Sequence, residues 1–167
     1  MTMRRLTSFL SDRSGAAAVE MVLILPVALA LILTTCEGGF YFICEHRVVK
    51  GVRDAARYAA RLDLSNYACP GATFSGSAAT VQNVQNLART GKLSGGTTGV
   101  TGWVNRDVAI AVTCLSDQRG IYAKTGGYAP RVRVSTRVVY PSIMGAMGFT
   151  SATIHITAAA QSPVIGL

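Results

Sequence analysis

Apolar residues dominate one long stretch near the start of the chain. A short polar segment, residues 1–15, comes first, and a predominantly apolar run then extends from Ala16 to Cys36. Its single charged residue is Glu20, and Pro26 lies six residues further on. Because a helix rises about 1.5 Å per residue, this run is long enough to cross a hydrocarbon core about 30 Å thick. The sequence therefore predicts a transmembrane helix over residues 16–36.

The next segment, residues 37–62, has the pattern of an amphipathic extension of that helix. Gly38 and Gly39 come directly after Glu37, and two adjacent glycines weaken a helix by about 1 kcal/mol each. Together with Pro26, they predict a bend or hinge. Further along, basic residues recur every three or four positions, and small apolar residues occupy the opposite face. This basic stripe consists of Arg47, Lys50, Arg53, Arg57 and Arg61.

The basic stripe has two interpretations. In the first, it is the solvated face of a helix that packs on its own domain. In the second, it contacts lipid headgroups, a partner protein or nucleic acid. Nucleic acid is disfavoured, because only a single aromatic residue, Tyr58, lies among the arginines, whereas binding to single strands uses a series of aromatic rings that stack on bases.

Residues 63–167 have the pattern of a small α+β domain. One segment places apolar residues on a single helical face, and three later segments have the composition of β-strands. These segments are Ser77–Thr90, Asp107–Leu115, Arg131–Tyr140 and Ala152–Ala160. Tyr67–Gly76 and Leu93–Gly102 are expected to be loops. The predicted fold class is α+β: a long N-terminal helix, a second helix and a three- or four-stranded antiparallel sheet with helices on one face.

Residues Arg131–Tyr140 alternate most sharply, with valines on one face and arginines on the other, which is the period of a half-buried strand. In the last strand we expect Ile154 and Ile156 to point inward. The connection Pro141–Phe149 is unusually apolar. It either folds back into the core or forms an exposed contact for another subunit or a surface.

Charge and composition narrow the function classes. The formal net charge is +8, and only 14% of residues are charged, against about 25% in a typical soluble domain. Thr90-Gly91-Lys92 lacks the flanking residues of a phosphate loop, since Asn86 and Leu93 stand where glycine and Ser/Thr are needed. No nucleotide or other cofactor is predicted.

Metal and catalytic chemistry are also disfavoured. Cys44-Glu45-His46 places three potential ligand types together, but the only other histidine is His155, which lies in a predicted strand. No elbow around a nucleophilic serine and no zinc-protease motif occurs. The sequence therefore favours a non-enzymatic protein without a metal.

The order of residues at the N-terminus distinguishes this chain from an ordinary secretory precursor. Small residues, Gly15 to Ala18, come before the apolar run, whereas a secretory signal has its cleavage site after that run. This order predicts cleavage on the cytoplasmic side, which leaves the apolar helix on the mature protein. Arg4, Arg5 and Arg13 precede the helix and place the N-terminus in the cytoplasm. The basic stripe adds positive charge after the helix as well, so the number of basic residues on each side does not decide the orientation. The expected cleavage on the cytoplasmic side decides it.

At this point the chain resembles a known family. The string from Arg13 to Glu20, RSGAAAVE, resembles the processing site of type IV pilin-like precursors. Continued through Leu25-Pro26 and Glu37 to Ala55-Ala56-Arg57-Tyr58-Ala59-Ala60, it resembles TadE-like minor pseudopilins of the tight-adherence (Flp/Tad) pilus. The resemblance covers roughly residues 13–61. It implies that a prepilin peptidase cuts between Gly15 and Ala16, which makes Glu20 the fifth residue of the mature chain.

The chemistry of that cut gives Glu20 a role. Cleavage creates an ammonium group on Ala16, and Glu20 lies one helical turn away. In a bundle of such helices, Glu20 of one subunit neutralises the N-terminus of a neighbour, so that two charges that are unfavourable in lipid share one site. The simpler interpretation is a carboxylate at the membrane interface that makes no such pair.

The resemblance implies a minor pilin, a structural subunit that acts in pilus assembly, adhesion or surface colonisation. Its partners would be prepilin peptidase, other pilins, the assembly machinery of the inner membrane and the lipid bilayer. Residues 63–167 would be periplasmic, and extracellular in the assembled pilus. The alternatives are a single-pass periplasmic binding or scaffold protein and a type II secretion pseudopilin. The sequence leaves open the choice between a TadE-like and a TadF-like subunit.

The chain has four cysteines, of which Cys36 lies in the apolar run. In an oxidising periplasm, Cys69 and Cys114 can form a disulfide. It would close a loop of about 45 residues, worth roughly 4 kcal/mol in the chain-entropy model. Cys44 is the competing partner for Cys114.

Overall fold

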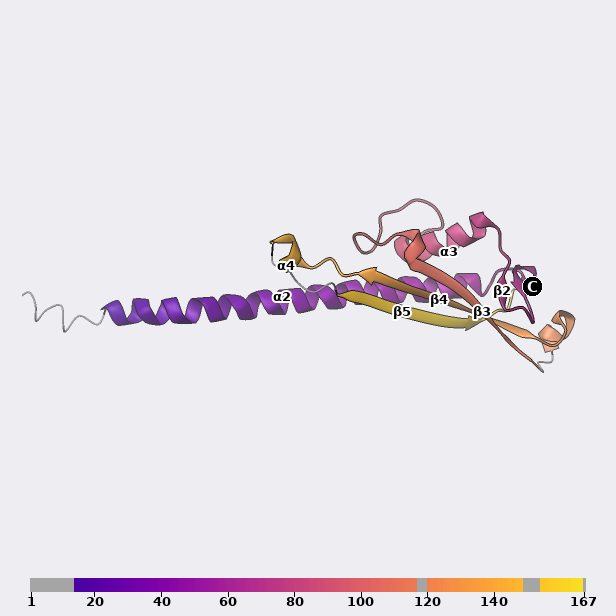
Figure 1. Cartoon of the computed structure of the whole chain (residues 1–167), viewed down its shortest axis with the longest axis horizontal. Coiled ribbons are helices and arrows are strands. Elements are labelled where there is room, and N and C mark those ends of the chain that lie inside the picture. The colour runs from indigo at the N-terminus through magenta and orange to yellow at the C-terminus, as the bar shows by residue number, and fades with distance from the viewer. Residues whose placement is uncertain (1–13, 117–119, 149–153, 167) are drawn as a thin grey trace, which may run out of the picture. The chain divides into compact units, whose positions relative to one another are not determined.

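The computed structural model describes residues 14–116, 120–148 and 154–166 (Figure 1). Most of the expected leader, residues 1–13, lies outside this description. The chain divides into two compact units, Met1–Gly39 and Phe40–Leu167. Helix α2, Ser14–Ala59, is 46 residues long and contributes to both of them.

The first unit consists, in its described residues, of the first part of α2. This helix is long and apolar enough to cross a membrane, and its best window has a mean hydropathy of 2.6 with none of it buried. Two hydroxyl groups near the end of the apolar run are satisfied within the helix: Thr34 Oγ1 donates to Ala30 O (2.7 Å) and Thr35 Oγ1 to Leu31 O (2.8 Å). Such internal bonding is what a helix in lipid requires. The helix continues through Pro26 and through Gly38 and Gly39.

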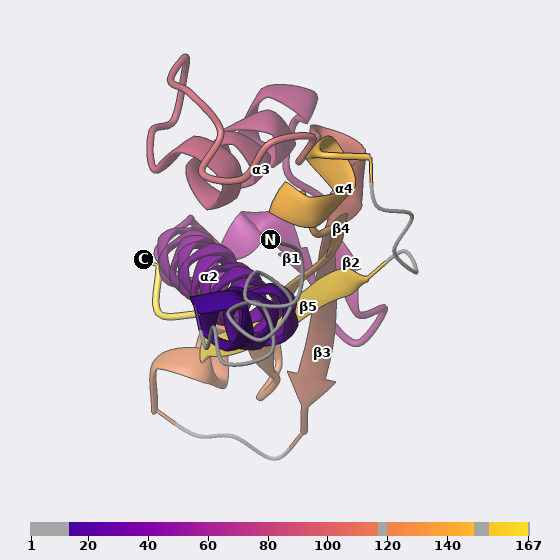
Figure 2. The ribbon, with the colours of Figure 1, turned by 90° about the vertical axis from the view of Figure 1, so that its left-hand side faces the viewer.

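The second unit confirms the α+β fold class. Besides the end of α2 it contains helices α3 (Ala78–Thr90) and α4 (Ile143–Ala146), and short 3-10 turns at Leu64–Asn66, Asn105–Asp107 and Gly120–Thr125. The strands are β1 (Tyr67–Ala68), β2 (Thr73–Phe74), β3 (Val108–Leu115), β4 (Ala129–Val139) and β5 (His155–Pro163). They form an antiparallel β1-β2 hairpin and an antiparallel sheet in the order β3-β4-β5. Figure 2 shows α2 end-on, with α3 and the strands around it.

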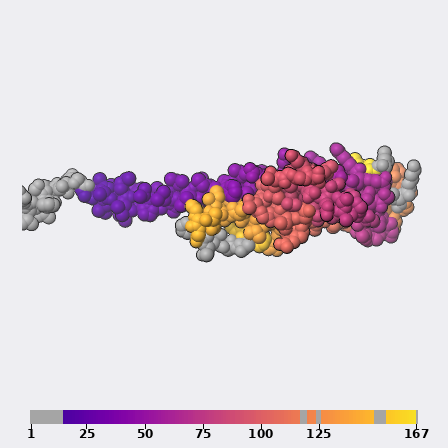
Figure 3. Space-filling view, turned by 90° about the horizontal axis from the view of Figure 1, so that it is seen from above, coloured from indigo at the N-terminus to yellow at the C-terminus, as the bar shows by residue number. Residues whose placement is uncertain are grey.

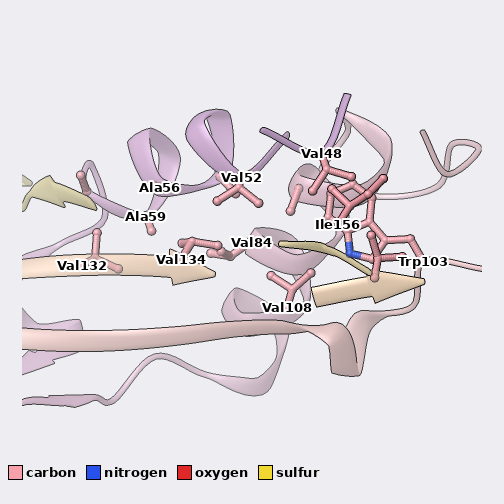
Figure 4. Packing of buried hydrophobic residues seen from close by; sticks show 14 of the residues in the cluster. Val48, Val52, Ala56, Ala59, Val84, Trp103, Val108, Val132, Val134 and Ile156 are labelled. Atoms are coloured by element: carbon pink, nitrogen blue, oxygen red, sulfur yellow. The ribbon is translucent and has the colours of Figure 1, made fainter. Parts of the chain in front are cut away.

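One face of α2 forms the centre of the core in the second unit. The buried positions recur every three or four residues, so they share a side of the helix. They are Val48, Val52, Ala55, Ala56 and Ala59, none more than 1% exposed. Opposite them lie Val132 and Val134 of β4 and Val84 of α3, each 0% exposed (Figure 4). The alternation along β4 therefore turns its valines toward the helices and its arginines outward, as its sequence predicts.

Gly51 sets how closely α2 and α3 approach. A Cβ atom at Gly51 would lie 1.9 Å from the carbonyl oxygen of Ala88 and 3.4 Å from the Trp103 ring. Only glycine leaves room for this contact between the two backbones. Helix α3 is fixed at both ends, because Ser77 Oγ accepts a hydrogen bond from Thr80 N (3.2 Å) and Gly91 adopts a left-handed φ of 72°.

The end of α2 is held by residues from distant parts of the chain. The Tyr67 hydroxyl donates to the carbonyl of Ala59, and Ile165 N donates to the carbonyl of Ala60 (2.9 Å). These bonds satisfy carbonyl groups that a helix leaves unpaired at its C-terminus. Burial raises the pKa of Tyr67, so this hydroxyl keeps its proton and remains a donor.

The buried polar groups of the core form a short chain of hydrogen bonds. The indole nitrogen of Trp103, which is 1% exposed, donates to Thr136 Oγ1 (3.0 Å), and Thr136 Oγ1 donates to the carbonyl of Asp107 (2.8 Å). Each member has a partner, so burying them carries no large penalty. These hydrogen bonds join the segment before β3 to the middle of β4.

The structure corrects three sequence-based expectations. Residues 67–76 contain the β1-β2 hairpin rather than only a loop. Ile156 is buried, but Ile154 is 47% exposed, so its predicted inward position is wrong. It precedes β5, and Tyr140 fills that end of the core by packing against Phe40 and Tyr41. The last strand also extends to Pro163, beyond Ala160, while residues 152 and 153 of its predicted start lie outside the described residues.

We predict that Gly51→Ala destabilises the second unit by about 2 kcal/mol, because the added methyl group overlaps the backbone of α3. Unfolding of the full-length protein in detergent, followed by the fluorescence of Trp103, measures this. Gly39→Ala is the control, since a Cβ there meets nothing within 4 Å. Helix propensity alone should stabilise that variant by up to about 1 kcal/mol. Equal stabilisation by both substitutions would contradict the close packing at Gly51.

Candidate functional site

The expected processing site lies at the start of α2. Gly15, Ala16 and Glu20 are within the first turns of the helix, and all three are exposed. Residues four apart lie on the same side of a helix, so Glu20 and the nitrogen that a cut would leave on Ala16 share one face. A long apolar surface follows them, with Leu23 68% and Leu25 53% exposed. A carboxylate beside such a surface is well placed to pair with a cation from a neighbouring helix.

The basic stripe occupies the exposed side of α2 in the second unit. Four of its members lie within the helix, and Arg61 lies in the turn that follows it. Arg47 Nη1 donates to the carbonyl of Gly99 (3.1 Å), so this end of the stripe contacts its own domain. Arg57 lies 3.8 Å from Asp54, the single ion pair among the described residues, and its side chain is 72% exposed. The middle of the stripe, Lys50 and Arg53, is exposed to solvent.

A disulfide joins the hairpin to the sheet. Cys69, between β1 and β2, is bonded to Cys114 near the end of β3, with their Cα atoms 5.8 Å apart. The competing residue, Cys44, is a free thiol in the core and is 1% exposed. Burial raises the pKa of this thiol, which keeps it protonated and unreactive. Cys36 is free and exposed on α2.

Exposed apolar side chains gather at the end of the second unit where α2 enters it. We call this set the apolar collar. It consists of Phe42, Ile43, Ile143, Met147 and Ile154, which are between 40% and 61% exposed. They are brought together because Tyr140 packs against Phe40 and Tyr41 of α2, with ring centroids 5.9 and 5.2 Å apart, and its N–H donates to the carbonyl of Ile154 (2.9 Å).

Helix α4 projects from this end of the unit (Figure 3). The connection Pro141–Phe149 is thus exposed at Ile143 and Met147 rather than folded into the core, and Phe149 itself lies outside the described residues. The apolar collar was not predicted as a set, since its members come from two distant parts of the sequence, residues 42–43 and 143–154. An apolar surface of this kind marks a contact with lipid or with another protein.

One hollow, of about 470 Å³, lies beside β3 and is lined by residues such as Phe74, Gln85 and Ile110, with no titratable side chain among its lining residues. Within residues 14–116, 120–148 and 154–166, no three His, Cys, Asp or Glu side chains gather in an arrangement that would hold a metal.

Together these features define a chain with one candidate membrane anchor, whose helix continues into the core of a small α+β domain. A family model described as TadE-like protein matches residues 15–57. The match confirms the resemblance found in the sequence, and it spans almost all of α2. It supports a protein associated with the Tad pilus, and TadE-like pilus proteins are structural. No curated protein and no solved structure matches the chain.

We predict that replacing both Cys69 and Cys114 with serine lowers the free energy of unfolding by about 4 kcal/mol, because the unfolded chain gains the freedom of the opened loop. Chemical unfolding of the oxidised protein and the double variant measures the difference. Cys36→Ser serves as the control, since this thiol is free and exposed. A double variant as stable as the control would contradict a structural disulfide.

Proposed function

We propose that the chain is a minor pilin of the Tad/Flp pilus, a structural subunit that is processed by prepilin peptidase and acts in pilus assembly, adhesion or surface colonisation. The observation that carries the proposal is the coincidence of the TadE-like match, residues 15–57, with helix α2. That helix presents Gly15, Ala16 and Glu20 at one end and forms the core of the domain at the other. The family-defining segment is thus also the element that links anchor and domain.

In this proposal Glu20 sets the register of assembly. Inserting an isolated carboxylate into lipid costs free energy, on the order of 3 kcal/mol when the residue lies at the centre of a transmembrane helix. After cleavage, the ammonium of Ala16 on a neighbouring pilin supplies the opposite charge at the same depth. Pairing removes both penalties at once, and it does so only when the two helices are aligned along their axes. The partners are therefore prepilin peptidase, other pilins and the inner-membrane assembly machinery.

The orientation that we propose places residues 1–15 in the cytoplasm as the leader, 16–36 across the inner membrane, 37–62 as the amphipathic extension and 63–167 in the periplasm. The Cys69–Cys114 disulfide supports the periplasmic location, because structural disulfides persist in oxidising compartments.

A second candidate is a membrane-anchored periplasmic binding or scaffold protein that never enters a filament. The exposed basic stripe favours it, since Lys50 and Arg53 are available to a partner whether or not the helix leaves the membrane. The two functions differ in processing and in the role of Glu20. The periplasmic scaffold needs neither a cut before Ala16 nor an intramembrane carboxylate.

The deciding experiment is the intact mass of the protein from its native host and from a strain that lacks prepilin peptidase. We expect a chain that begins at Ala16 in the first strain and retains Gly15 in the second. Retention of residues 1–15 in both strains would contradict the pilin proposal and favour the scaffold.

We further predict that the Glu20→Gln variant is still cleaved before Ala16, so that its mature mass differs from that of the wild type only by the substitution. Its incorporation into sheared pili should fall at least tenfold, because the amide cannot neutralise a neighbouring ammonium. Immunoblots of pilus and membrane fractions measure incorporation. Glu45→Gln, on the part of α2 within the second unit, is the matched control. Equal incorporation of both variants would refute the charge-pairing role.

A further inference from the structure

The outer face of the three-stranded sheet carries a row of arginines, and the three strands themselves contain no acidic residue. Arg131, Arg133 and Arg137 project from β4 on the face opposite the core, and all three are exposed. We call them the arginine row. His155 lies at the end of the row, with its Nδ1 3.4 Å from Arg137 Nη2. Among the described strand residues, this face therefore carries positive charge and no negative charge.

Small side chains next to the row leave two shallow hollows between β4 and β5. One, of about 270 Å³, is lined by Arg133 together with Ser135 and Thr157. The other, of similar volume, is lined by Arg131, Gln161 and Ser162. Each hollow thus combines a guanidinium group with hydroxyl or amide groups. Arginine binds carboxylates through two parallel hydrogen bonds, so each hollow is suited to a carboxylate side chain.

Among the described residues, strand β5 also forms an unpaired edge of the sheet, and the register shows which of its backbone groups point away from β4. It is an end strand of the sheet, in the order β3-β4-β5. Tyr140 N donates to Ile154 O, and Val164 N donates to Pro130 O, both at 2.9 Å. In an antiparallel pair, bonded positions alternate, so the even-numbered residues of β5 face β4 and the odd-numbered residues face outward.

The outward N–H and C=O groups therefore belong to Thr157, Ala159 and Gln161. Pro163, which has no N–H, occupies an outward position, where proline is tolerated in a sheet. The exposed side chains of the outward residues are small or polar, and no lysine or inward charge protects the edge. Unprotected edges of this kind are templates for a further strand.

We propose that the edge of β5 binds an extended acidic segment of a partner protein as a fourth strand of this sheet. The backbone of the segment pairs with Thr157, Ala159 and Gln161. Its acidic side chains lie on the outer face, where Arg131 and Arg133 of β4 extend past their partners Pro163 and Gln161 on β5 toward them. Alternate residues of a strand share a face and lie about 6.8 Å apart. The segment therefore carries acidic residues at alternate positions, in register with Arg131 and Arg133.

Charge complementarity favours an acidic segment over a second copy of β5 at this edge. A second copy of β5 brings no acidic residue, and the chain as a whole has a net charge of +8, so self-pairing gains no electrostatic complementarity. Nucleic acid would supply negative charge, but the exposed positions of β4 and β5 offer no aromatic ring for base stacking. The inference goes beyond the proposed function and does not depend on leader processing.

The test measures binding to the full-length protein in lipid nanodiscs. The probes are a ten-residue peptide of alternating Glu and Val, the same peptide with Lys in place of Glu, and a short DNA duplex. We expect the Glu peptide to bind at least tenfold more tightly than the other two. Binding of DNA at least as tight as that of the Glu peptide, or equal binding of both peptides, would overturn the proposal.

Two variants separate the backbone contribution from the charge contribution. Arg131→Ala combined with Arg133→Ala should weaken binding of the Glu peptide about tenfold, whereas Lys50→Ala combined with Arg53→Ala, which removes the same charge from the basic stripe, should leave it within twofold. Ala159→Pro removes one outward N–H without breaking the β4–β5 pairing, and it should also weaken binding about tenfold. Unchanged binding in both the arginine and the proline variants would refute the site.

A measurement on the unaltered protein covers the case in which Ala159→Pro does not fold. Binding of the Glu peptide should slow amide hydrogen exchange at Thr157, Ala159 and Gln161 at least tenfold. Exchange at Ala158 and Ala160, whose amides face β4, should change little. Exchange that slows at neither set of residues while the peptide binds would place the peptide elsewhere and overturn the proposal.

Discussion

The structure depends on the packing of one face of α2 against β4 and α3. Val48, Val52, Ala56 and Ala59 are small enough for the helix to lie close to the valines of the strand, and Gly51 allows direct contact with the backbone of α3. A fully buried valine contributes on the order of 1.5–3 kcal/mol, so these side chains contribute substantially to a core that also contains Trp103, Tyr140 and Ile156. The same helix presents an exposed apolar surface over residues 19–33, which no other described part of the chain covers. A surface of this kind suits lipid or neighbouring helices.

This division of one helix between two environments explains why the family match coincides with it. Residues 15–57 contain the apolar anchor, Glu20, and the residues that build the core. Substitutions there affect both the membrane-facing surface and the folding of the domain. The residues that follow form the arginine row, the edge of β5 and the part of the apolar collar contributed by Ile143, Met147 and Ile154.

The features that were predictable from sequence are those encoded by local periodicity. The apolar run, the helix Ala78–Thr90 with its Ser77 cap, and the alternation of β4 each depend on neighbours within a few residues. The β1-β2 hairpin was missed, because strands of two residues are too short to show a period. Ile154 was misplaced because its exposure depends on Tyr140, which occupies that end of the core. The Trp103–Thr136–Asp107 hydrogen bonds join residues up to 33 positions apart, which no local pattern reveals.

Among the candidate sites, too, those formed by neighbouring residues were predictable from sequence, and those assembled from distant segments were not. The spacing from Gly15 to Glu20 is a local motif that the sequence alone predicts to be a processing site, and this role stays a prediction. The pairing of Cys69 with Cys114 was one of two alternatives, and the burial of Cys44 decides between them. The apolar collar and the edge of β5 required the strand order, because the arginines of β4 and the outward amides of β5 become neighbours only in the folded sheet. Surfaces assembled from distant segments are the part that sequence reasoning could not supply.

The central claim, that α2 lies in lipid over its first half and in a protein core over its second, is tested most directly by the accessibility of spin labels along the helix in nanodiscs. Nitroxides at Leu25, Leu29, Lys50 and Arg57, in a background with Cys36 and Cys44 replaced by alanine, report contact with oxygen in lipid or with a nickel chelate in water. The account predicts that the two leucine positions are accessible to oxygen and shielded from nickel, and that the two basic positions show the reverse. Nickel access at all four positions would contradict a membrane anchor.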